Sequence, residues 1–187
     1  NAGVEDGRDR RLAPGMSSDD ADDTRKPIPE RFHSFEPGRP FEACSVCSRA
    51  FGEDEPYMIE KAFQRGETVY EYAICQGCHD GIRAELSEES KKRIEEHLGE
   101  AVGRAGLFDD PLERCVFSGR ELGDEYLVCG LFVGRWMVPD LPRFAISGEE
   151  MEKLAGLLSN TTRERLDEFT DDVLGIPGLT NPVPVLV

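Results

Sequence analysis

Residues 44–78 read CSVCSRAFGEDEPYMIEKAFQRGETVYEYAICQGC, and this stretch decides the fold of the chain. A Cys-x-x-Cys pair opens it and a second pair closes it. Between the pairs, residues 57–63 and 68–74 are rich in Tyr, Val, Ile and Phe, which favour strands. Gln64-Arg65-Gly66 between these two runs predicts a hairpin turn.

The four cysteines of the two pairs have a spacing that is typical of a metal site. Zinc bound by four thiolates at about 2.3 Å has no open position, so we expect one structural zinc ion per chain. Two redox-active pairs, buried free thiols and an iron or iron–sulfur centre remain alternatives. CQGCH at 75–79 also matches the attachment pattern of c-type haem, which would leave CSVC at 44–47 without a role.

The order of a Cys-x-x-Cys knuckle, a hairpin, a second Cys-x-x-Cys and a helix resembles the treble-clef zinc fingers. The resemblance covers about Phe41 to Leu98. It implies zinc ligands at Cys44, Cys47, Cys75 and Cys78. His79 directly follows the last of them and is a candidate to donate a hydrogen bond to a thiolate. That fold group includes binding modules, ribosomal proteins and nucleases, so the resemblance does not define a function.

A helical stretch is expected after the second pair. Candidate apolar positions are Ile82, Leu86, Ile94 and Leu98. Ser87-Glu88-Glu89-Ser90 has the pattern of a new helix start, so we expect two short helices. Glycines at 99, 103 and 106 are expected to end the helical pattern.

The second half of the chain resembles the first. Four blocks align in order: CVFSGRELGDEYLV (115–128) with residues 44–59, AISGEE (145–150) with 73–78, LSNTTRERLDEFT (158–170) with 86–98, and GIPGL (175–179) with 103–107. The last three blocks share one offset of 72 residues. This predicts an α+β protein of two tandem treble-clef-like units, each with a knuckle, a β-hairpin and one or two helices, packed as a pseudo-symmetric pair. The predicted units are 41–111 and 112–187, after a disordered acidic, Pro-rich tail at 1–40.

Only one of the four ligand positions keeps its cysteine in the second unit. The corresponding residues are Cys115, Ser118, Ser147 and Glu150, so we expect this unit to fold without metal. Burial of the apolar stretch 126–141 would stabilise it instead. Ser147 is interpreted as a helix N-cap, with Glu150 at the capping-box position, rather than as a nucleophile and its base. Cys129 is expected to be a small buried residue, and a Cys115–Cys129 disulfide is an alternative.

Composition disfavours some classes of partner. The chain has 22 basic and 38 acidic residues and a formal charge of −16. Binding to nucleic acids or to anionic membranes depends on Lys and Arg, so both are disfavoured as main partners. The sequence has no apolar run long enough to span a membrane and no signal-like apolar segment near its start, which predicts a cytoplasmic protein.

The predicted function is a non-enzymatic, zinc-stabilised protein-interaction or adaptor module that meets a basic surface on a protein partner. Candidate contact residues are Phe132, Trp136, Met137, Val185 and Leu186, with burial in the core as the alternative for Phe132 and Trp136. A nucleic-acid-binding zinc protein is an alternative, for which KKR at 91–93 is the one dense basic cluster. An enzyme with an unrecognised carboxylate site is a further alternative.

Overall fold

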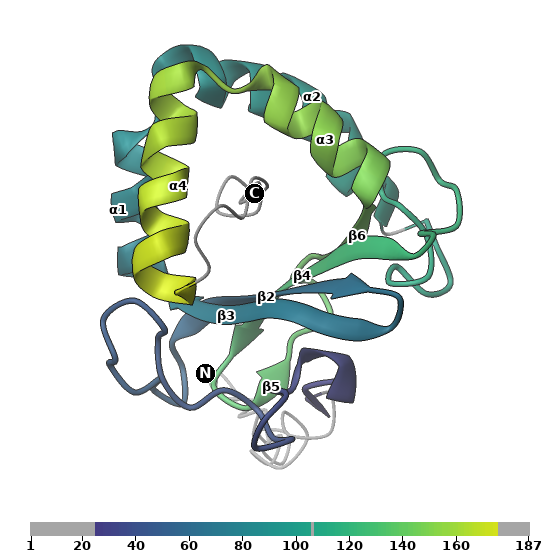
Figure 1. Ribbon diagram of the computed structural model, residues 1–187. Helices are drawn as coiled ribbons and strands as arrows, with labels where there is room; N and C mark the ends of the chain where they lie inside the picture. The colour runs from purple at the N-terminus through teal and green to yellow at the C-terminus, as the bar shows by residue number, and fades with distance from the viewer. Residues whose placement is uncertain (1–24, 106, 176–187) are drawn as a thin grey trace, which may run out of the picture.

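The computed structural model describes residues 25–105 and 107–175. Within these ranges the chain forms four α-helices and one six-stranded antiparallel sheet (Figure 1). The predicted α+β class is therefore confirmed. None of the helices in the described ranges is both long and apolar enough to cross a membrane.

The elements follow one another along the chain in two similar series. The strands are β1 (Lys26–Pro27), β2 (Pro56–Gln64), β3 (Glu67–Cys75), β4 (Glu125–Val133), β5 (Trp136–Met137) and β6 (Arg143–Ser147). The helices are α1 (Gln76–Glu85), α2 (Glu88–Ala105), α3 (Gly148–Leu157) and α4 (Asn160–Leu174), with a short 3-10 helix, η1, at Glu30–Phe32. The strand order is β1-β5-β4-β2-β3, and β6 also pairs with β4.

The β2–β3 hairpin closes through a two-residue turn. Gln64 pairs with Glu67, and Arg65 and Gly66 between them have positive φ angles of 52° and 84°. Two successive residues with positive φ give the turn a twist that matches that of the strands. The predicted hairpin and its turn are confirmed.

The long antiparallel pairing of β2 with β4 joins the two halves of the chain. The two strands have nine residues each, and Glu60 lies opposite Cys129 at the middle of the ladder. The pairing is symmetric about this point, because Tyr57 faces Phe132 while Tyr126 faces Phe63. The two halves therefore contribute to one sheet, rather than each forming a sheet of its own.

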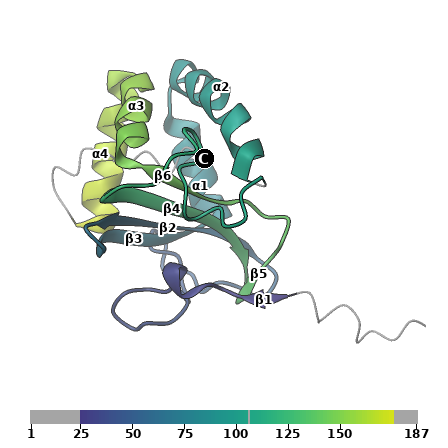
Figure 2. The same cartoon turned by 90° about the vertical axis from the view of Figure 1, so that its right-hand side faces the viewer.

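The four helices lie on one face of the sheet, and η1 lies on the other (Figures 1 and 2). A larger apolar core fills the helix side, from Tyr72 and Phe144 on the sheet to Leu154 and Leu166 on the helices. A second, smaller core on the opposite side includes Phe32 of η1.

Four hydroxyl side chains join the helices of the two halves where one helix follows another. Ser87 and Ser159 precede α2 and α4, and their Oγ atoms lie 3.0 Å apart. Each serine also donates a hydrogen bond to the helix of the other half. The Ser87 N–H donates to Thr162 Oγ1 at 3.1 Å, and the Ser159 N–H donates to Ser90 Oγ at 2.9 Å. Each serine also caps its own helix, since Ser90 N–H and Thr162 N–H donate to them at 3.2 Å. The predicted helix start at 87–90 is confirmed.

The second helix of the first half is longer than the sequence predicts. α2 continues past Gly99 and Gly103 to Ala105, so the expected break at these glycines is wrong. A glycine inside a helix costs about 1 kcal/mol relative to alanine. Burial of Ile94, Leu98 and Ala101 on one face of α2 offsets this cost.

The part of the predicted tail that the structure describes is packed against the sheet. Ile28 and Phe32 are buried in the smaller core. The Glu71 carboxylate forms an ion pair with the buried Lys61 at 2.9 Å and accepts a hydrogen bond from Ser34 Oγ at 2.7 Å. Residues 25–40 thus contribute to the fold, and residues 1–24 lie outside the described ranges.

Candidate metal centre

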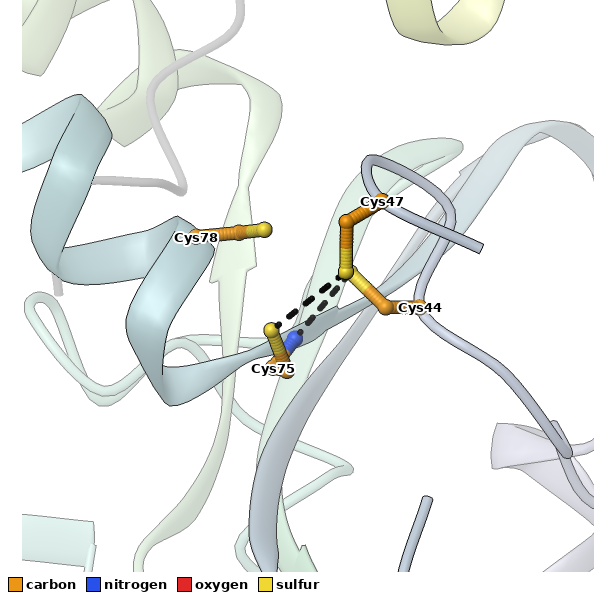
Figure 3. Close-up of side chains that lie close together, drawn as sticks. All are labelled: Cys44, Cys47, Cys75 and Cys78. Atoms are coloured by element: carbon orange, nitrogen blue, oxygen red, sulfur yellow. Dashed lines mark hydrogen bonds between the residues drawn. The ribbon is translucent and has the colours of Figure 1, made fainter. Parts of the chain in front are cut away.

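The structure brings the four predicted ligands together at one end of the first hairpin. Cys44 and Cys47 lie in the loop before β2, Cys75 is the last residue of β3, and Cys78 is in the first turn of α1. Their Sγ atoms all lie within 4.8 Å of one another. Figure 3 shows the four side chains converging from the loop and from the start of the helix.

Backbone hydrogen bonds shape the loop of the first pair into a knuckle. The Cys44 N–H donates to Arg49 O, and the Ser48 N–H donates to Cys44 O, both at 2.9 Å. The turn requires a positive φ of 58° at Ser48. The Ser45 N–H donates to Ala73 O at 2.7 Å, which ties the knuckle to β3 two residues before Cys75. The two cysteine pairs are therefore held together by the backbone.

The spacing of the sulfur atoms fits a tetrahedral metal ion. Bonds of about 2.3 Å to a central zinc place neighbouring sulfurs about 3.8 Å apart. Cys47 Sγ and Cys75 Sγ are separated by 3.9 Å. A disulfide requires about 2.05 Å, and all six cysteines in the chain are free. Four sulfur ligands suit zinc or a similar thiophilic metal.

The start of α1 favours a thiolate at Cys75. Burial acts to raise the pKa of Cys75, but hydrogen bonds from the Cys78 backbone N–H and from the Cys78, Arg49 and Cys44 side chains outweigh it and lower the pKa to about 7. The pKa of Cys78 is raised by burial and by sharing its proton with Cys75. A metal ion binds the thiolate form of cysteine, so these hydrogen bonds favour metal binding at Cys75.

The four cysteines differ in their access to solvent. Cys44 and Cys75 are buried, Cys78 is half-buried and Cys47 is exposed. His79 lies beside this cluster, and its Nδ1 is 3.6 Å from the Asp80 carboxylate. The hydrogen bond from His79 to a thiolate stays a prediction.

A second knuckle with the same backbone pattern occurs 71 residues further along the chain. The Cys115 N–H donates to Arg120 O at 2.9 Å, and the Gly119 N–H donates to Cys115 O at 2.8 Å. Gly119 has a φ of 69°, in the place that Ser48 takes in the first knuckle. The Val116 N–H donates to Ala145 O at 2.9 Å and ties this knuckle to β6.

Two hydroxyl groups take the place of thiolates around Cys115, which is fully buried. Burial acts to raise the pKa of Cys115, but hydrogen bonds from the side chains and backbone N–H groups of Ser147 and Ser118 outweigh it and lower the pKa. The Glu150 carboxylate instead accepts from Lys153 Nζ at 2.7 Å and lies 3.8 Å from His97 Nε2. Within the described ranges, Cys44, Cys47, Cys75 and Cys78 form the one group placed to hold a metal ion.

The predicted capping box at the start of α3 is wrong, although Ser147 does occupy the N-cap position. Its side chain makes no capping hydrogen bond. The Ser147 hydroxyl interacts with Cys115, and the Glu150 carboxylate contacts Lys153 and His97. Ser159 at the start of α4 does cap its helix.

Ser48 and Gly119 occupy the same positive-φ position in the two knuckles, and we expect substitutions at these two residues to differ in their effect on stability. Replacing Gly119 by Ala should destabilise the chain by about 1 kcal/mol, because a Cβ disfavours the left-handed region. No atom lies within 4 Å of the added Cβ, so the effect comes from the backbone alone. Ser48→Gly, which removes a Cβ, should change stability by less than about 0.5 kcal/mol. Urea unfolding of both variants measures the difference, and equal losses would contradict this reading of the two turns.

The candidate contact residues have different environments. Phe132 is fully buried, which matches the alternative of a core position, whereas Trp136 is 38% exposed and Met137 is half-buried. Val185 and Leu186 lie outside the described residues. Cys129 is buried, as expected.

A buried carboxylate at the middle of β2 was missed by the sequence analysis. Glu60 is fully buried and accepts hydrogen bonds from Tyr70 Oη at 3.0 Å and Tyr72 Oη at 2.9 Å. Burial raises the pKa of Glu60 to about 8, although the two tyrosine hydroxyls act to lower it. The available signal was an acidic residue, next to Lys61, within the mostly apolar strand run YMIEKAF at 57–63.

Comparison of the chain with known proteins finds no match among family models, curated proteins or solved structures.

Proposed function

We propose that this chain is a zinc-stabilised protein-interaction module in which the metal has a structural role. The observation that carries the proposal is the closed set of four sulfur ligands at Cys44, Cys47, Cys75 and Cys78. Four protein ligands leave a tetrahedral zinc ion no position for water or substrate. Such an ion contributes to folding rather than to a reaction, so we propose a non-enzymatic role.

We further propose that the chain is a tandem duplication of a treble-clef-like unit. Three features support this: the two knuckles with the same backbone hydrogen bonds, the symmetric β2–β4 register, and the reciprocal hydroxyl contacts between Ser87 and Ser159. The first unit would hold one zinc ion, and the second would be metal-free because Ser118, Ser147 and Glu150 replace three thiolates. The shared sheet would make the pair one interaction module.

The surface charge favours a protein partner with a basic surface over a nucleic acid. The formal charge is −16. The basic cluster at 91–93 is neutralised on its own helix, because Lys91, Lys92 and Arg93 form ion pairs with Glu88, Glu96 and Glu89. This cluster therefore offers little unpaired positive charge to phosphates. Six free cysteines suit a reducing compartment, and we propose the cytoplasm.

Affinity capture from the native host with the zinc-loaded chain tests this function. We expect a recurrent protein partner whose binding weakens as salt rises from about 0.1 to 0.5 M, since screening reduces attraction between charged surfaces. Purified partner should then bind the wild-type chain directly in a titration. Cys75→Ser, which loses a ligand, should not retain the partner, whereas the matched variant Cys129→Ala should. Recovery of nuclease-sensitive material alone would favour the nucleic-acid alternative instead.

A further inference from the structure

A cavity of about 350 Å³ lies beside the second knuckle. The apolar side chains that line it belong to Leu112, Leu122 and Tyr126. Arg31 also lines the cavity. Arg31 belongs to η1, which lies on the side of the sheet away from the helices (Figure 2). The cavity is separate from the four-cysteine cluster, because none of its lining residues belongs to the first knuckle.

The first knuckle has an aromatic ring where the second has this cavity. Phe51 stacks on Tyr57 with ring centroids 3.9 Å apart and planes inclined by 9°. Phe51 follows Ala50, which bridges to Ala43, and in the second knuckle Leu122 follows Glu121, which bridges to Arg114 in the same way. Leu122 thus takes the place of Phe51.

One face of the Tyr126 ring is already covered. Tyr126 stacks on Phe63 with ring centroids 5.0 Å apart and planes inclined by 18°. No second aromatic ring stacks on Tyr126 within the described ranges, whereas Tyr57 has Phe51 as its stacking partner. Leucine is smaller than phenylalanine and is not planar. The cavity is therefore the space where the stacking ring of the first knuckle has no counterpart.

The rim of the cavity carries charges of both signs. It consists of Arg31, Glu113, Arg114 and Glu121, all exposed. Arg31 Nη1 donates to Leu112 O at 2.9 Å, and Arg114 Nη1 donates to Gly119 O at 3.2 Å. These bonds fix the two guanidinium groups at the rim. The two guanidinium groups can donate to backbone C=O groups of a bound polypeptide, and the two carboxylates can accept from its N–H groups. The same four groups can pair with charged side chains next to the bound residue.

We infer that this cavity receives one aromatic side chain of a protein partner, stacked on Tyr126 where Phe51 stacks on Tyr57. The inference rests on the proposed interaction function and names the anchor of the partner. Small-molecule sites usually enclose most of the ligand, whereas this rim is open to solvent. A pocket with an aromatic floor and a polar rim is typical of an anchor position in a protein interface. A single ring placed there would be held by stacking and by burial of its faces.

The test uses N-acetyl-L-phenylalaninamide as a probe with the zinc-loaded full chain. Its binding should shift the backbone amide NMR signals of residues 112, 122 and 126, with a dissociation constant on the order of 1 mM for a ligand of this size. N-acetyl-L-leucinamide, which has no ring, should bind at least about tenfold more weakly. Leu122→Phe places in the cavity the ring that Phe51 provides in the first knuckle. It should weaken binding of the probe at least about tenfold while the chain stays folded.

Several outcomes would overturn the inference. Unchanged probe binding by Leu122→Phe, equal binding of the leucine probe, or no shift at these residues would each do so. Tighter binding of free L-phenylalanine than of the blocked amide would make the cavity a small-molecule site. If Leu122→Phe does not fold, Tyr126→Leu replaces it, since loss of the stacking ring should have the same effect. A partner that binds Leu122→Phe as well as wild type would exclude the cavity as its anchor and leave the proposed interaction function standing.

Discussion

Replacing Cys75 by Ser is expected to lower the free energy of unfolding by more than about 5 kcal/mol, which is comparable to the whole stability of many domains. The metal connects the knuckle loop to the junction of β3 and α1. Cys44 and Cys75 are also part of the larger apolar core, which contains residues from strands of both halves and from α2, α3 and α4. Loss of the metal should therefore destabilise the second half as well. Urea unfolding followed by circular dichroism, with and without a chelator, measures the effect.

The second knuckle supplies a matched control for this substitution. Cys115→Ser makes the same chemical change at the corresponding position, where a metal ion is not expected. Cys115→Ser should lower the free energy of unfolding by about 1–2 kcal/mol relative to wild type, because it changes a buried site. This difference between Cys115→Ser and wild type should be the same with and without chelator. Chelator should lower the free energy of unfolding of the wild-type protein. It should not lower that of Cys75→Ser any further, because this variant has already lost the metal. If chelator leaves the wild-type unfolding curve unchanged, the metal does not stabilise the fold.

Replacing Glu60 by Gln is expected to make the chain more stable at alkaline pH. Burial raises the pKa of Glu60 from 4.5 to about 8 in the folded state, so folding favours the protonated form. The stabilising contribution of that proton is fully present below pH 4.5 and is lost as the pH rises through about 8. Between pH 6 and 8.5, wild type should lose on the order of 2 kcal/mol relative to Glu60→Gln. Urea unfolding at several pH values measures the difference.

The two tyrosines provide an independent check of the Glu60 prediction. Tyr70 and Tyr72 donate to the carboxylate and so stabilise its charged form. Tyr72→Phe should raise the pKa of Glu60 further, so that the loss of stability continues to higher pH than in wild type. The thiol of Cys129, opposite Glu60, has its pKa raised well above 9 by burial and stays protonated in this range. Parallel pH profiles for wild type and Glu60→Gln would show that Glu60 does not titrate in this window.

The local features of the first half could be predicted from the sequence. The four cysteines, the turn at Arg65-Gly66 and the helix start at Ser87 each depend on residues close together in the chain. The spacing between the cysteine pairs leaves room for one hairpin, so the convergence of the sulfurs follows from local structure. These are the contacts for which propensity and spacing carry most of the information.

Long-range pairing accounts for what the sequence did not predict. The β2–β4 ladder joins strands about 70 residues apart, and nothing local indicates which strand edge meets which. That ladder, with the helices above it, buries Glu60. It also brings Phe63 against Tyr126. The length of α2 has the same kind of cause, because tertiary burial of Leu98 and Ala101 outweighs the helix-breaking tendency of Gly99 and Gly103.

The second knuckle shows which part of the metal site is independent of metal. Cys115 keeps the same turn and the same backbone bonds as Cys44, with Gly119 in place of Ser48. Its strand β4 is apolar, and Leu127, Val128 and Phe132 are fully buried. Burial of these side chains would offset the absence of metal ligands. The predicted outline of the second half, a knuckle followed by strands and then helices, is present without four thiolates.

Native mass spectrometry of the intact chain after expression with added zinc counts the metal ions that each chain holds. We expect one zinc ion per wild-type chain, one per Cys115→Ser chain and none in Cys75→Ser. Two zinc ions per wild-type chain would contradict the metal-free second knuckle. No metal in the wild-type chain would contradict the zinc centre itself.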